Sequence, residues 1–85
     1  MTDAILSRVL AVVSGVAGPR RTPPGAGPAT PLGEAGYWLD SVDVLEVILA
    51  CEHQFGVVLG DAEDLTVENL ASVASLAALI ARKLR

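Results

Sequence analysis

Apolar residues recur every three or four positions in three separate stretches of this chain, and this spacing limits its fold more than any other feature. Such a period matches the α-helix and gathers the apolar side chains on one helix face. The stretches predict a first helix over about 3–17, a second over about 41–55 and a last one over about 72–84. A short helix over about 66–70 is expected between the second and the last. We therefore expect an all-α fold without strands.

A stretch rich in proline and glycine separates the first two predicted helices. Gly18 to Gly36 contains five prolines and five glycines, and both residue types interrupt regular structure. We expect a long connecting loop over 18–39, a length that is unusual in a small domain and often functional or partly disordered. Leu32 is its best candidate for a core anchor. Trp38, in an apolar cluster just before the next helix, is expected to pack on the bundle.

The chain is short enough to form one domain only, which we place over 1–85. A domain of 85 residues buries a modest core. Its one cysteine, Cys51, excludes an internal disulfide, and with a single histidine no metal site is expected. These features fit a reducing cytoplasm. The first apolar stretch lacks a basic start, carries Arg8 and is too short to span a bilayer, so neither export nor a membrane span is expected.

The net charge of −4 is distributed unevenly along the chain. Lysine and arginine occur only near the two ends, and the stretch from Thr22 to Ala81 holds nine acidic residues and neither of them. Such a surface repels nucleic acid and anionic lipid, because both require cationic groups. It should instead attract proteins that have basic patches. The alternative is that the acidic residues form a solvated face that binds no partner.

The second predicted helix has two different faces. Asp40 is a suitable N-cap, and Asp43 places a negative charge in the first turn, where the helix dipole favours it. One apolar stripe should face the core and comprises Val44, Val47, Ile48, Cys51 and Phe55. The neighbouring stripe mixes apolar, acidic and polar side chains and comprises Val42, Leu45, Glu46, Leu49, Glu52 and His53. A mixed stripe beside an apolar one indicates a surface that meets a partner.

The sequence offers no set of residues that suits catalysis. A nucleophilic serine needs a base within hydrogen-bond reach. His53, the single histidine, follows Ser41 by twelve residues, which is about 18 Å along a helix that rises 1.5 Å per residue. No nucleophile-elbow sequence surrounds Ser41 either. We expect a non-catalytic protein with no catalytic residues.

The residues at the start of the second predicted helix match a known motif. The run Leu39-Asp40-Ser41-Val42-Asp43, followed by Leu45-Glu46-Val47-Ile48-Leu49, resembles the Asp-Ser-Leu attachment motif of acyl carrier proteins. The run from Cys51 to Val57 is similar to the end of that helix in the family, and Leu65 to Val73 to the third helix and the start of the fourth. The resemblance covers roughly 32–80. It implies an acyl-carrier-like four-helix bundle with three main helices and one short helix.

The resemblance implies that Ser41 carries 4′-phosphopantetheine, which a phosphopantetheinyl transferase brings from coenzyme A. The thiol of this arm would then hold acyl groups as thioesters. Asp40 and Val42 would lie beside the attachment point, where Asp40 caps the helix and leaves Ser41 on the exposed first turn. A helix N-terminus also favours the negative phosphodiester.

The same resemblance implies how such a carrier meets its partners. Carrier proteins present the second helix to acyl-loading, ketosynthase-type or condensing enzymes that have basic docking patches. Carried over by position, the docking residues are Asp43, Leu45, Glu46, Leu49 and Glu52, together with Asp40 and Val42 at the attachment point. We expect the chain to act as a monomer.

Departures from the usual pattern point to a specialised pathway. Val42 replaces the usual leucine, Gly60 stands where a proline is common, and Tyr37-Trp38 precedes the motif. We interpret the chain as a discrete carrier of polyketide or mixed peptide biosynthesis rather than of housekeeping fatty acid biosynthesis. A peptidyl or aminoacyl carrier of a non-ribosomal peptide pathway is the nearest alternative, and a helical interaction module without a cofactor is the third.

Overall fold

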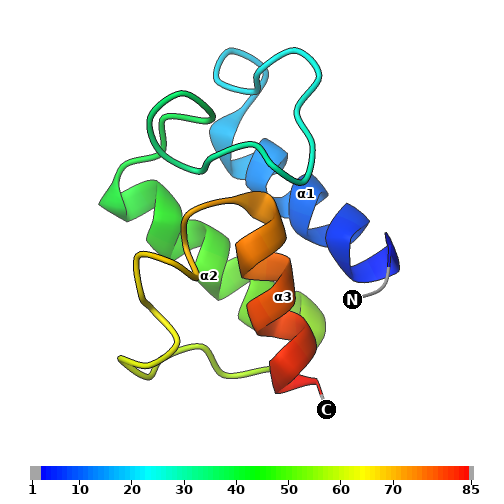
Figure 1. The fold of residues 1–85 in the computed structure, drawn as a ribbon, viewed down its shortest axis with the longest axis vertical. Coiled ribbons are helices and arrows are strands. Elements are labelled where there is room, and N and C mark those ends of the chain that lie inside the picture. Colours follow the sequence, from blue (N-terminus) through cyan, green and yellow to red (C-terminus); the bar gives the residue numbers. More distant parts are fainter. Residues whose placement is uncertain (1–2, 85) are drawn as a thin grey trace.

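The computed structural model describes residues 3–84, and within this range it has three α-helices and no strand. Helix α1 covers Asp3–Ala17, α2 covers Ser41–Phe55 and α3 covers Val73–Lys83. Helix α1 contacts both α2 and α3, and Figure 1 shows the three gathered about one centre. The all-helical fold expected from the apolar spacing is thus confirmed. None of the helices in the described range is both long and apolar enough to cross a membrane.

The core draws its side chains from all three helices. Val9 and Val13 of α1, Val47 and Cys51 of α2 and Ile80 of α3 have no exposed surface. Within α1 and α2 these residues lie four positions apart, so the helical period alone turns them to the same side. Burial raises the pKa of the Cys51 thiol to about 11. The thiol therefore remains neutral and packs as a small apolar group.

Arg8 joins α1 to the far end of α2. Its guanidinium donates a hydrogen bond to the carbonyl oxygen of Gln54 at 2.8 Å and lies 4.2 Å from the centre of the Phe55 ring. A cation is favoured at a helix C-terminus, where carbonyl groups lack helical partners. Gly56 then ends α2 with a left-handed φ of 66°.

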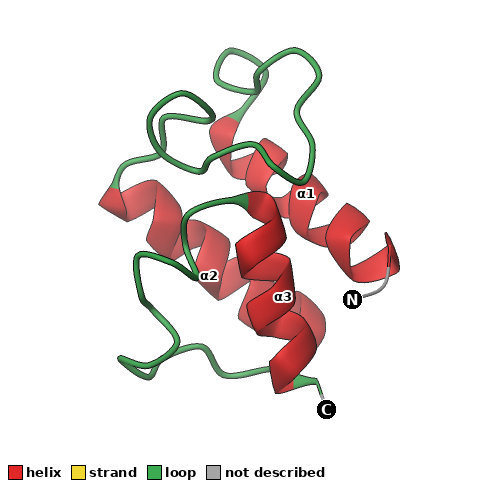
Figure 2. Ribbon diagram, viewed as in Figure 1, coloured by secondary structure: helices red, strands yellow, loops and turns green. Residues whose placement is uncertain are grey.

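The first loop is fixed to the start of α3 by backbone hydrogen bonds. The N–H of Leu32 donates to the carbonyl of Ala71 at 3.1 Å, and the N–H of Val73 donates to the carbonyl of Thr30 at 3.2 Å. Figure 2 shows this loop arching over the end of the bundle where α1 ends and α2 begins. Leu32 is 1% exposed, so it anchors the loop in the core as the sequence indicated.

Tyr37 rather than Trp38 is the aromatic anchor of the first loop. Tyr37 has no exposed surface, and its hydroxyl shares a hydrogen bond of 2.8 Å with the Ser14 hydroxyl. Trp38 is 62% exposed, so the prediction that it packs on the bundle is wrong. The reason is that Tyr37 and Leu39 are both buried in the core, which leaves the residue between them outside.

The second loop joins α2 to α3 over 56–72. The short helix predicted over 66–70 is not formed, and turns occupy this part of the second loop. One hydrogen bond of helical type, from Leu70 N–H to the Thr66 carbonyl at 3.1 Å, is present. Asn69 gives the physical reason, because its side-chain amide donates to the carbonyl of Asp64 at 2.9 Å. This side chain folds the segment back on itself, which competes with continuation of a helix.

Two cations in the last turn of α3 hold the second loop. The Lys83 ammonium lies 2.8 Å from the buried Oδ2 of Asp64, and Arg82 donates to Oδ1 of Asn69 at 3.1 Å. The Asp64 oxygen has this charge partner but, among the described residues, no hydrogen bond of good geometry. The close contact with the Asp64 carboxylate raises the pKa of Lys83. The basic end of α3 therefore stabilises the helix and fixes the loop beside it.

Candidate functional site

A capping box fixes the position at which α2 begins. Oδ1 of Asp40 accepts a hydrogen bond from the N–H of Asp43 at 2.9 Å, and Oδ2 of Asp43 accepts one from the N–H of Asp40 at 3.2 Å. Each side chain thus satisfies a backbone donor that a helix start leaves free. Ser41 follows the cap directly and is the first residue of α2.

Ser41 is exposed, and no residue in the described range forms a hydrogen bond with its hydroxyl. Its neighbours Asp40 and Val42 are exposed as well. His53 lies on the same helix near its opposite end, too far away to act as a base for this hydroxyl. The hydroxyl can therefore receive a group from another enzyme, but no described residue is hydrogen-bonded to it as a base.

The other four serines of the chain are less suited to receive a group. Ser14 is engaged by Tyr37, while Ser72 and Ser75 form a second capping box at the start of α3. Ser7 is exposed but lies in the fifth position of α1, where the backbone N–H groups are already bonded within the helix. Ser41 alone among these five combines exposure, a free hydroxyl and a helix N-terminus.

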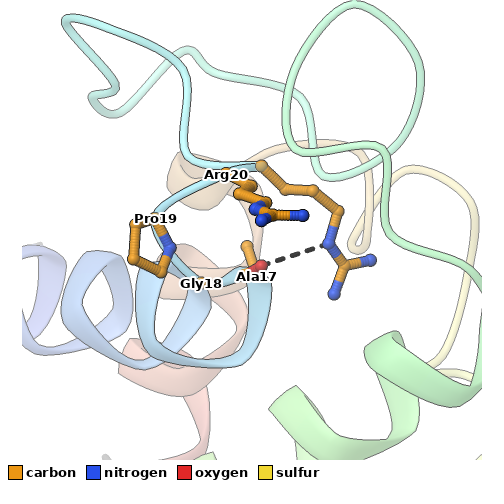
Figure 3. Close-up of a pocket in the computed structure, with 5 residues that line it drawn as sticks. Ala17, Gly18, Pro19 and Arg20 are labelled. Atoms are coloured by element: carbon orange, nitrogen blue, oxygen red, sulfur yellow. Dashed lines mark hydrogen bonds between the residues drawn. The ribbon is translucent and has the colours of Figure 1, made fainter.

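Arg21 brings a positive charge to the start of α2. Its Nη1 donates to Oδ2 of Asp43 at 2.6 Å, and its Nη2 approaches Oδ1 at 3.4 Å. Its Nε also donates to the carbonyl oxygen of Ala17 at 3.1 Å, at the end of α1. Arg21 therefore joins the end of α1 to the start of α2. It is also one of the residues 17–21 that line a surface pocket, which Figure 3 shows.

The contact with Arg21 changes the electrostatics of the capping box. The hydrogen bond from Arg21, assisted by that from the backbone of Asp40, lowers the pKa of Asp43. Asp43 in turn raises the pKa of Arg21. Sequence reasoning missed this pair, because Arg21 lies one residue before the acidic stretch. The signal was an arginine shortly after a helix that ends at Ala17, because basic side chains there can bind the last helix carbonyls.

The predicted docking residues of α2 divide into two groups. Val42 is 63% exposed and Leu45 and Leu49 are each 54% exposed; Glu46 is exposed beside them. Asp43 is bound to Arg21, and Oε2 of Glu52 accepts the N–H of Leu59 at 2.8 Å. The docking surface of α2 therefore offers three exposed apolar side chains and the free carboxylate of Glu46, while Asp43 and Glu52 also hold neighbouring loops.

The region between α2 and the second loop is packed as core. Val47, Leu59, Val73 and Leu76 have no exposed surface, and Leu65 is 38% exposed. The pocket lined by residues 17–21 involves none of them. Among the described residues, no group of three or more His, Cys, Asp or Glu side chains is arranged to hold a metal ion.

A small helical domain that offers an unactivated serine hydroxyl at a capped helix start has the features of a carrier domain. The family model described as "Phosphopantetheine attachment site" matches residues 6–81. Because this match spans nearly the whole chain, the protein belongs to that family, whose members attach 4′-phosphopantetheine covalently. Comparison with curated proteins gave no match, and comparison with solved structures gave none.

The residues at the start of α2 fit such a group. An exposed hydroxyl gives a transferase access, and the backbone N–H groups of the first turn favour the negative phosphodiester. Asp40 and Asp43 oppose this charge, but Arg21 lies against Asp43 and offsets part of the repulsion. When bound, the arm supplies a thiol that can hold a carboxylic acid as a thioester.

Proposed function

We propose that this protein is a non-catalytic acyl carrier whose Ser41 bears 4′-phosphopantetheine. The observation that carries the proposal is the free, exposed hydroxyl of Ser41 at the first position of α2, within the range matched by the phosphopantetheine family. The capping box of Asp40 and Asp43 holds this position at the helix start. The chain itself presents the hydroxyl, and the chemistry of attachment belongs to the transferase.

Carrier domains work with a phosphopantetheinyl transferase and with biosynthetic enzymes. We propose that acyl-loading, ketosynthase-type or condensing enzymes dock on the mixed face of α2. Val42, Leu45 and Leu49 would form the apolar part of the contact. Glu46, which is exposed, would supply the carboxylate that pairs with a basic patch. Asp43 and Glu52 would contribute less than their charge suggests, because each already has an internal partner.

A specialised polyketide or mixed pathway in the cytoplasm, and action as a monomer, stay predictions from the sequence. An aminoacyl or peptidyl cargo would use the same arm and the same serine. The acidic context Leu39-Asp40-Ser41-Val42-Asp43 favours an acyl cargo. Membership of the phosphopantetheine family favours either cargo over an interaction module that has no cofactor.

The proposal is tested by intact mass spectrometry after incubation with coenzyme A and a promiscuous transferase. The wild-type chain should gain the mass of one phosphopantetheine, and Ser41→Ala should gain none. Ser7→Ala is the matched control, because it removes another exposed helical serine and should be modified like the wild type. A wild-type chain that stays unmodified would contradict the proposal.

The cargo is tested on the modified protein. Acyl donors and aminoacyl-activating enzymes are offered separately, and the thioester is read as a further mass increase that hydroxylamine removes. We expect the arm to be loaded with acyl groups and not with aminoacyl groups. Preferred loading with an amino acid would replace the acyl assignment by the peptidyl one.

A further inference from the structure

Trp38 holds its backbone in a conformation that its side chain disfavours. Its φ is +57°, in the left-handed region where a Cβ crowds the backbone and which glycine adopts freely. In the described range, Gly18, Gly25 and Gly56 occupy three of the other positive-φ positions and Ala35 the fourth. A bulky residue there is uncommon and marks a place where surrounding contacts override local preference.

Contacts on both sides of Trp38 impose this conformation. The N–H of Trp38 donates to the carbonyl of Gly33 at 2.9 Å, and the N–H of Leu39 donates to the carbonyl of Leu32 at 2.9 Å. Tyr37 has no exposed surface and Leu39 is only 9% exposed. Because both neighbours are fixed inward, the indole is held outward. A glycine would satisfy the same backbone with less strain, so the fold does not need a tryptophan here.

The surroundings of Trp38 have the composition of a protein interface. The indole is 62% exposed, and the exposed apolar row of α2 begins four residues later with Val42 and Leu45. Asp40 and Glu46 add exposed carboxylates to the same stretch. Aromatic and apolar side chains at the centre with charged groups around them are typical of binding surfaces, and tryptophan is the residue type most enriched at their hot spots.

Trp38 also lies close enough to Ser41 to fall within the footprint of a protein that docks around the Ser41 hydroxyl. Ser41 is the third residue after Trp38, so their Cα atoms are at most about 11 Å apart. A standard interface covers about 800 Å² on each partner, which corresponds to a disc of about 16 Å radius. A transferase whose interface is centred on Ser41 therefore covers Trp38 too.

We propose that Trp38 is an anchor residue for the phosphopantetheinyl transferase. Its indole inserts into an apolar pocket of the transferase beside the active site, and a cationic rim of that pocket pairs with Asp40 and Glu46. The inference rests on the proposed attachment of the arm at Ser41. It adds a specific contact from the first loop to a docking surface that otherwise consists of α2.

The kinetic test compares four proteins: the wild type, Trp38→Gly, Trp38→Phe and Val58→Gly. Val58 is the matched control, because it is 72% exposed and follows the far end of α2, about 20 Å from Ser41 along the helix axis. We expect Trp38→Gly to raise the KM for the carrier about tenfold or more with little change in kcat, as loss of an interface hot spot does. Trp38→Phe should keep most of the affinity, and Val58→Gly all of it.

Thermal unfolding separates lost docking from lost folding. Glycine accepts a φ of +57°, so the Tm of Trp38→Gly should lie within about 4 °C of the wild type. A third measurement needs no variant, because Trp38 is the single tryptophan of the chain. Protein labelled with 5-fluorotryptophan gives one ¹⁹F signal from residue 38, which should shift or broaden when transferase is added without coenzyme A.

The outcomes are distinct from those of the proposed function. The anchor is refuted if the wild type is modified at Ser41 while Trp38→Gly and Val58→Gly have the same KM. A ¹⁹F signal that saturating transferase leaves unchanged refutes it equally, even if Trp38→Gly folds poorly. A wild-type chain that accepts no arm overturns the proposed function first, and the anchor with it.

Discussion

Gly36 is the position in the first loop at which one added methyl group should do most damage. Gly36 is buried, and a Cβ there would meet the backbone of Pro31, closest to its carbonyl oxygen and 2.8 Å from its carbonyl carbon. Real Cβ atoms essentially never come closer than 3.0 Å to another heavy atom. Pro31 is not free to withdraw, because its carbonyl accepts the N–H of Tyr37 at 3.0 Å and it bridges to Ser72.

The cost of Gly36→Ala follows from this obstruction. Overpacking costs about 1–3 kcal/mol in well-packed cores, and we place this variant at about 3 kcal/mol because the obstacle is backbone rather than a flexible side chain. Each kcal/mol lowers the Tm of a domain this size by roughly 4–8 °C. Gly36→Ala should therefore melt at least about 12 °C below the wild type.

Circular dichroism melts of Gly36→Ala, Gly33→Ala and the wild type measure this directly. Gly33 lies in the same loop, but a Cβ there meets nothing within 4 Å. Its variant should therefore stay within about 4 °C of the wild-type Tm. Equal melting of Gly36→Ala and Gly33→Ala would show that Gly36 does not press against Pro31. The account of how the loop holds Tyr37 inward and Trp38 outward would then be wrong.

Three further predictions concern the helix ends and their ion pairs. Asp40→Ala removes the acceptor of the Asp43 N–H and should cost about 1 kcal/mol in urea unfolding, whereas Asp40→Asn should cost much less. Because Arg21 lowers the pKa of Asp43, stability from this pair should be complete above the usual value of 3.8 and fall as pH drops through the lowered one. Carboxyl NMR should show that midpoint below 3.8 in the wild type and returned toward it in Arg21→Gln; an unchanged midpoint in the variant would contradict the pair. Asp64 raises the pKa of Lys83 above 10.5, so its contribution should be complete below that value and disappear as pH rises through the raised one. Urea unfolding should show this alkaline loss in the wild type and not in Lys83→Gln, and identical profiles would refute it.

The parts of the fold that the sequence predicted are those decided by local physics. The period of the apolar residues identifies three helices. Asp40 is a typical N-cap residue and Gly56 a typical C-terminal stop, and both take these places in α2. The buried members of its apolar stripe, Val47 and Cys51 among them, follow from the same spacing. These features depend on neighbours within one or two helical turns.

The parts that the sequence did not predict depend on distant contacts. Two aromatic residues stand side by side at Tyr37 and Trp38, and nothing local shows which one turns inward. The choice is made by Ser14, which meets the Tyr37 hydroxyl across 23 positions of sequence. Likewise the missing short helix results from Asn69, whose side chain binds carbonyls of the preceding loop.

The candidate site shows the same division. The motif around Ser41 was visible because carrier families keep attachment residues close together in sequence, and the structure places that hydroxyl on the surface. The pairing of Arg21 with Asp43 joins positions 22 residues apart across a loop that has no periodic pattern. Only the fold shows that one of the acids predicted to dock already has a cation against it.

The central claim is that one hydroxyl out of five serines receives the arm, and site-localising tandem mass spectrometry tests it most directly. The protein is treated with transferase and coenzyme A, digested, and its peptides are fragmented to place the added phosphopantetheine. The account predicts that the whole of the added mass lies on residue 41. Attachment at Ser7, Ser14, Ser72 or Ser75 instead, or no attachment to the folded chain, would contradict it.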